Sequence, residues 1–123
     1  MQYSMKTILW ISRHEMTTEQ MTDLERIMQD NIQLLCCRDT VNQIETILPL
    51  LEQADAIAAV LPLGLMSQLV SHANGKLVMQ SVSARVPTGI YRTLPDGRTE
   101  QEFQFVHQCW QQIIKLEYEV KTL

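Results

Sequence analysis

The segment TILWISRHEMTTEQMTDLERIM at residues 7–28 decides the fold of this chain. It opens with the apolar run TILWI, which predicts a short buried strand. An amphipathic helix is predicted next, with an apolar stripe formed by Met21, Leu24, Ile27 and Met28. The segment is therefore the first half of a β-α-β unit.

The same alternation continues along the chain. Apolar runs at residues 32–37, 56–61 and 77–82 predict three more buried strands, and helical spacing at 41–53 and 65–73 predicts two more helices. Because the strand runs are apolar on both faces, they favour a parallel sheet with helices on both sides. Since crossovers between parallel strands are right-handed, we expect a Rossmann-like, mostly parallel α/β fold.

Three local signals set the expected helix boundaries. Thr17 and Gln20 have the spacing of a capping box at the start of the first helix, and Thr40 with Gln43 repeats that spacing before the second. Pro49 falls inside the second expected helix and should kink or shorten it.

The C-terminal part follows a different pattern. Two short strands at residues 90–94 and 99–105 flank Pro95-Asp96-Gly97, which predicts a hairpin. A last helix is expected over residues 106–118, with a stripe formed by Val106, Cys109, Trp110, Ile113 and Ile114. The hairpin and helix either complete the core or supply a dimer interface.

Length and composition indicate one globular domain. The chain has 123 residues, of which 46% are hydrophobic and 20% charged, so a disordered protein is excluded. We expect a single domain over residues 1–123, with an α/β core at 1–87 and the hairpin and helix at 88–123. The formal charge of −4 argues against a partner that is a long nucleic acid.

The expected location is the cytoplasm. The apolar run at residues 8–11 is too short for a secretory signal, and no run reaches the length needed to span a membrane. Three cysteines, an odd number, are typical of free thiols in a reducing compartment. Neither they nor the histidines have metal-ligand spacing, so we expect no metal and no cofactor.

Candidate site residues follow the predicted strands, because ligands of open parallel sheets bind at the carboxyl ends. These residues are Ser12, Arg13 and His14 after the first strand, Arg38, Asp39 and Thr40 after the second, Pro62 and Leu63 after the third, and Ser81, Ser83 and Arg85 at the end of the fourth. Three of the six arginines thus lie at one expected rim, together with hydroxyl groups. This composition predicts a pocket for an anion such as phosphate.

The loop after the first strand is the most informative part of that rim. A helix that begins at Thr17 directs its N–H groups toward a ligand beside residues 12–14. His14 is the candidate for proton transfer, whereas His72 and His107 are interpreted as structural. The glycine-rich signatures G-x-G-x-x-G and G-x-x-x-x-G-K-[ST] do not occur, which argues against a dinucleotide dehydrogenase and a nucleoside-triphosphate hydrolase.

Residues 8–20, ILWISRHEMTTEQ, resemble the opening of small stand-alone CRISPR-associated proteins with a CARF-like (CRISPR-associated Rossmann) fold. Residues 59–63, AVLPL, are similar to a later segment of the same family. The resemblance implies a homodimer that binds a cyclic oligoadenylate, such as cyclic tetra-adenylate, across its two-fold axis. It assigns Ser12, Arg13 and His14 to catalysis and Thr17 to ligand binding.

Some members of that family are ring nucleases, which switch off type III CRISPR signalling by cutting the ring. The implied reaction needs no metal, because a ribose 2′-hydroxyl attacks the adjacent phosphate and leaves a 2′,3′-cyclic phosphate. The sequence offers no obvious second catalytic base. Two alternatives therefore stay open: a non-catalytic sensor or sponge for the messenger, and an unrelated small Rossmann-like module that binds a nucleotide or a protein.

Overall fold

Five strands and four helical segments make up the chain in a computed structural model that describes residues 5–117 and 119–123. In chain order they are β1 (Met5–Ile11), α1 (Thr18–Met28), β2 (Asn31–Cys37), the 3-10 turn η1 (Ile44–Thr46), α2 (Leu48–Gln53), β3 (Ala56–Ala59), α3 (Leu63–His72), β4 (Leu77–Thr93) and β5 (Thr99–Gln112). None of the described helices is long and apolar enough to cross a membrane.

The strands form one mixed sheet in the order β2-β1-β3-β4-β5. The first four are parallel to one another, and β5 pairs antiparallel with β4. The chain runs from β1 to β2 on one side and then returns to β3 on the other, so the strand order reverses between β1 and β3. A mostly parallel α/β sheet, as expected from the sequence, is confirmed.

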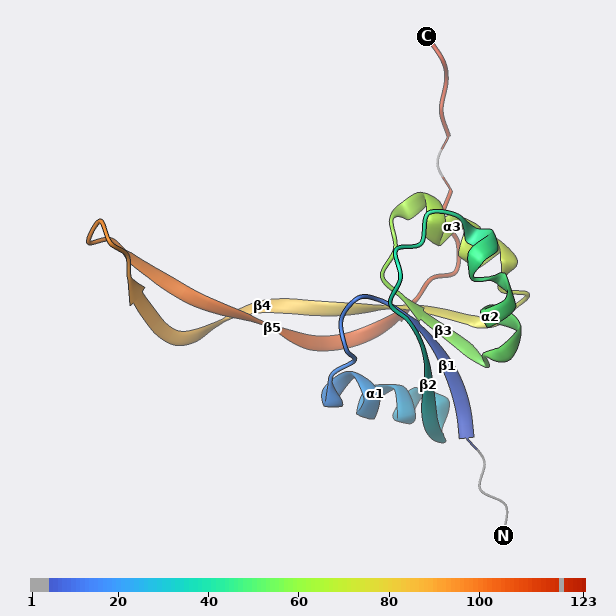
Figure 1. Ribbon diagram of the computed structural model, residues 1–123, viewed down its shortest axis with the longest axis horizontal. Helices are drawn as coiled ribbons and strands as arrows, with labels where there is room; N and C mark the ends of the chain where they lie inside the picture. Colours follow the sequence, from blue (N-terminus) through green and yellow to red (C-terminus); the bar gives the residue numbers. More distant parts are fainter. Residues whose placement is uncertain (1–4, 118) are drawn as a thin grey trace.

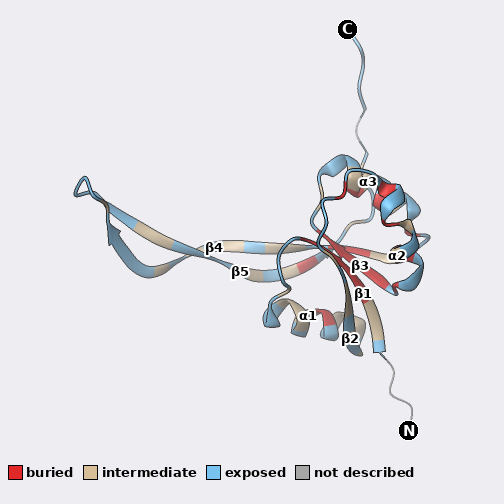
Figure 2. Cartoon of the chain, viewed as in Figure 1, coloured by how far each residue is buried: buried red, intermediate tan, exposed pale blue. Residues whose placement is uncertain are grey.

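Helices cover both faces of this sheet (Figure 1). On one face, Leu24 of α1 packs with Ile8 and Trp10. On the other, Leu51 of α2 and Leu69 of α3 pack with the odd-numbered residues of β1. Successive side chains of a strand point to opposite faces, so a strand covered on both sides must be apolar throughout. Figure 2 shows this buried centre of the sheet.

The second helical segment is shorter than predicted. Residues 41–43 are not helical, and the segment is divided into η1 and α2, with Pro49 in the first turn of α2. This position suits proline, because the first turn of a helix has no carbonyl partner for its missing N–H. The expectation that Thr40 and Gln43 form a capping box is therefore wrong, since no helix starts there and Gln43 makes no capping hydrogen bond.

The prediction of a helix over residues 106–118 is wrong. Residues 99–112 are a strand, and the described residues beyond it are irregular; Tyr118 lies outside the described residues. The misleading signal is the three-residue spacing between Val106 and Cys109 in the expected stripe. A β-bulge opposite Val82 and Ser83 inserts one extra residue into β5, and this brings both side chains to the same face.

The hairpin is also much longer than predicted. Its turn at Pro95-Asp96-Gly97 is confirmed, with Gly97 at φ 86°. However, β4 continues to Thr93, and Met79 is the last of its residues that pairs with the parallel strand β3. At a rise of about 3.3 Å per residue, residues 80–93 extend roughly 40 Å beyond the carboxyl edge of the sheet. Figure 1 shows this arm projecting from the body.

Candidate functional site

The loop after β1 is held by four hydrogen bonds. Ser12 is buried; its amide donates to the carbonyl of Cys37 at 3.2 Å, and its Oγ accepts from the amide of His14 at 3.1 Å. The indole of Trp10 donates to the carbonyl of His14 at 2.9 Å. Arg13 reaches across to Thr40 and donates to its hydroxyl. These bonds fix the loop at the carboxyl ends of β1 and β2.

The start of α1 lies beside this loop. Thr17 is the N-cap: its hydroxyl accepts from the amide of Gln20 at 3.2 Å, and the side-chain oxygen of Gln20 accepts from the amide of Thr17 at 2.9 Å. The predicted capping box is therefore confirmed.

A cavity that we call the arginine pocket lies where the strand order reverses, which is the usual ligand position in open α/β sheets. Its volume is about 350 Å³, and its lining includes Ser12, Arg13, Asp39, Thr40 and Pro62. Residues that follow three different strands thus meet here.

A second cavity, the serine–histidine pocket, lies between the start of α1 and the hairpin. Its volume is about 400 Å³, and its lining includes Ser12, His14, Thr17, Ser81, Ser83 and His107. Ser12 and Val60 line both this pocket and the arginine pocket, so the two cavities adjoin. The predicted residues from β1 and β4 are brought together here.

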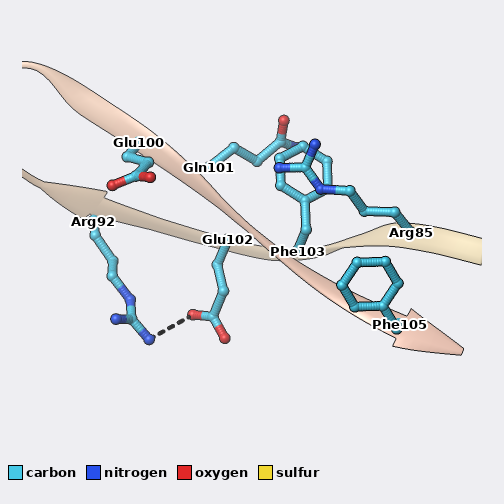
Figure 3. A pocket seen from close by; sticks show the side chains of 7 residues that line it. All are labelled: Arg85, Arg92, Glu100, Gln101, Glu102, Phe103 and Phe105. Carbon is cyan, nitrogen blue, oxygen red and sulfur yellow. Dashed lines mark hydrogen bonds and ion pairs between the residues drawn. The ribbon is translucent and has the colours of Figure 1, made fainter. Parts of the chain in front are cut away.

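A third cavity, the hairpin groove, lies farther out on the arm (Figure 3). Its volume is about 420 Å³, and its lining includes Arg85, Arg92, Glu102, Phe103 and Phe105. The guanidinium of Arg85 lies over the ring of Phe103, 3.9 Å from its centroid. Phe105 also lines the serine–histidine pocket and is 77% exposed, so it joins these two cavities.

The three arginines expected at one rim occupy different positions. Arg13 lines the arginine pocket, and Arg85 lies in the hairpin groove. Arg38 pairs with Glu15 at 3.4 Å and lines none of these three cavities. Leu63 is 75% exposed at the start of α3 and likewise lines none of them.

Neither His107, which lines the serine–histidine pocket, nor its partner Asp23 was predicted as a site residue. His107 Nε2 lies 2.9 Å from Oδ2 of Asp23, and His107 Nδ1 lies 2.9 Å from Oγ of Ser81. This hydrogen bond from His107 is the main cause that lowers the pKa of Asp23 below its ordinary value of 3.8, while burial opposes it. The alternation of Phe103, Phe105 and His107 is the signal that would have placed this histidine on a strand facing α1.

Compared with protein-family models, curated proteins and solved structures, the chain matches none of them.

Proposed function

We propose that the chain, with a Rossmann-like fold, binds a cyclic oligoadenylate as a homodimer and cleaves it without a metal to linear products ending in a 2′,3′-cyclic phosphate. By removing this messenger it ends type III CRISPR signalling. The observation that carries the proposal is the continuity of three cavities, with a cation at each end and hydroxyl and imidazole groups between.

The chemistry of the two ends suits a nucleotide ring. Arg13 lines the arginine pocket, where it donates to Thr40, and provides a cation for one phosphate. At the other end, Phe105 presents an exposed aromatic face, and Arg85 lies on Phe103. Aromatic rings and guanidinium planes are the groups on which unpaired bases stack. An adenine on Phe105 would leave its phosphate beside the serine–histidine pocket.

A homodimer is supported by the arm. Ile90, Tyr91 and Val106 are large apolar residues that are exposed on it. A two-stranded hairpin without further cover is only marginally stable in water, so a second copy packed on the arm would stabilise it. A two-fold dimer presents the same half-site twice, which fits a ring with repeated identical units.

In the proposed reaction the nucleophile belongs to the substrate. The ribose 2′-hydroxyl attacks the adjacent phosphorus, and the bond to the 5′ oxygen breaks. The protein holds the attacking and leaving oxygens in line and transfers protons, and His14 is the residue that we assign to proton transfer. Its neighbours Ser12 and Arg13 orient the ligand.

One observation favours a non-catalytic sponge or sensor as the second candidate. Among the described residues, no Lys or Arg lines the serine–histidine pocket. Cations then hold the ends of the ligand without touching a phosphate at its centre. Such a protein would sequester the messenger and return it intact.

The deciding experiment incubates purified protein with cyclic tetra-adenylate in EDTA and follows the ring by anion-exchange chromatography. We expect linear products with a cyclic phosphate end, and we expect His14→Ala and Arg13→Ala to lower the rate at least tenfold. Recovery of the intact ring after stoichiometric binding would show that the protein sequesters the messenger and does not cleave it. Absence of binding would overturn the proposed function.

A further inference from the structure

A hydrogen-bonded chain of four side chains crosses the serine–histidine pocket. Gln20 Nε2 lies 3.1 Å from Ser81 Oγ; Ser81 Oγ lies 2.9 Å from His107 Nδ1; and His107 Nε2 lies 2.9 Å from Asp23 Oδ2. Its members come from α1, β4 and β5, so the fold alone brings them together.

The direction of each hydrogen bond follows from the partners. The side-chain oxygen of Gln20 accepts from the amide of Thr17, so its NH₂ group faces Ser81 and can only donate. At the other end, an ionised Asp23 can only accept, so the proton of a neutral His107 lies on Nε2. The remaining nitrogen, Nδ1, is then an acceptor, and Ser81 donates its hydroxyl proton to it.

Burial holds this arrangement in place. The side chain of His107 is only 6% exposed, and that of Asp23 is 18% exposed. The ring of Trp110 lies 5.5 Å from the imidazole ring. Ser81 is half-buried and lines the pocket together with His107, so a ligand there reaches the hydroxyl that lies between Gln20 and His107.

We propose that Ser81 and His107 form a proton relay that accepts the proton of a ligand hydroxyl in this pocket, with Asp23 as the positioning residue. The inference rests on the proposed function and supplies the base that the cleavage reaction needs. The 2′-hydroxyl gives its proton to Ser81 Oγ while Ser81 gives its own to His107 Nδ1. The 2′ oxygen forms its bond to phosphorus as the 5′ oxygen leaves with the bonding electron pair.

Protons and charge balance in this step. The imidazolium formed on His107 is paired with the Asp23 carboxylate and returns its proton to water after the reaction. His14 lines the same pocket, and it protonates the departing 5′ oxygen. The relay therefore divides acid and base work between two histidines.

The test is a set of single-turnover cleavage rates measured between about pH 5 and about pH 9 with cyclic tetra-adenylate in EDTA. Ser81→Ala and His107→Gln should lower the rate at least tenfold while the ring still binds. The matched control is Ser71→Ala, since Ser71 is an exposed serine on α3 that lines none of the three cavities, and its rate should stay within about twofold of the wild type.

The pH profile distinguishes a relay from a structural role. Because the relay uses a base and an acid together, the wild-type rate should rise with pH, pass through a maximum and then fall, whereas His107→Gln should lack the inflection on the rising side. Asp23→Asn should lower the rate while the ligand still binds, because the imidazolium formed in the step loses its carboxylate partner. A His107→Gln variant that keeps the inflection on the rising side, or a Ser71→Ala variant as slow as Ser81→Ala, would overturn the relay.

A second readout needs no ligand. Nitrogen-15 spectra of the imidazole in the free protein should show a neutral His107 with its proton on Nε2, and a proton on Nδ1 would overturn the proposed direction of transfer. If cyclic tetra-adenylate does not bind, the proposed function fails. The spectra alone then decide in which direction Ser81, His107 and Asp23 donate their hydrogen bonds. Ser81→Ala removes a single hydroxyl and serves as the test variant if His107→Gln does not fold.

Discussion

The imidazole of His107 on β5 and the carboxylate of Asp23 on α1 lie 2.9 Å apart, although 84 positions separate them in the chain. This contact joins the hairpin to the helix whose N-terminus forms one side of the candidate site. It makes the stability of the fold and the geometry of the site depend on the same pair.

The pair predicts a loss of stability in acid. Because the pKa of Asp23 is lowered in the folded protein, its contribution is fully present above the ordinary value of 3.8 and is lost as pH falls through the folded value. We expect Asp23→Asn to reduce the free energy of unfolding at neutral pH by about 1–2 kcal/mol.

Urea unfolding at a series of pH values measures this difference. The difference in the free energy of unfolding between the wild type and Asp23→Asn should shrink as the pH falls below 3.8. Glu25→Gln on the exposed side of the same helix is the control and should leave stability nearly unchanged. A gap that stays constant down to pH 3 would show that ionisation of Asp23 contributes nothing.

Trp110 provides a test of the strand assignment. It is 8% exposed, its ring packs edge-on against Trp10 at 6.0 Å, and its indole donates to the carbonyl of Gln20 at 3.1 Å. We expect Trp110→Ala to destabilise the fold by about 3–5 kcal/mol, and Trp110→Phe by less, since it keeps most of the packing. Equal losses of stability in Trp110→Ala and Trp110→Phe, measured by thermal unfolding, would contradict this packing.

The sequence predicts the α/β body because its signals there are local. The apolar runs of β1 and β2 and the capping box at Thr17 each depend on neighbours in the chain. The strand β5 was missed because a bulge gives Val106 and Cys109, which lie on one face of the strand, the spacing of a helix.

Prediction of the site was limited for the same reason. Residues that follow β1 and β4 could be placed at the carboxyl edge, and Ser12, Ser81 and Ser83 do line one pocket. The position of Arg85 depends on how far β4 continues past that edge, and the roles of Asp23 and His107 depend on β5 being a strand. The first fact has no short-range signal in the sequence, and the alternation of Phe103, Phe105 and His107 is a short local signal for the second.

The proposed homodimer can be tested on the arm. Replacing Ile90, Tyr91 and Val106 together by Ser should convert a dimer to a monomer in light scattering coupled to size exclusion, because these side chains supply its apolar contact. Ile114→Ser is the control, since Ile114 is 80% exposed outside the hairpin. A wild-type monomer at the highest concentration tested would refute the interface.

Calorimetric titration of cyclic tetra-adenylate into the wild type, Arg13→Ala and Arg85→Ala tests the central claim, that one polyanion spans the three cavities. We expect wild-type binding and at least a tenfold loss of affinity in each variant, because the two arginines hold opposite ends of one ligand. Arg98→Ala is the control, since Arg98 pairs with Asp96 at the tip of the hairpin, and it should bind like the wild type. Wild-type binding that is unchanged in either variant, or no binding at all, would contradict the claim.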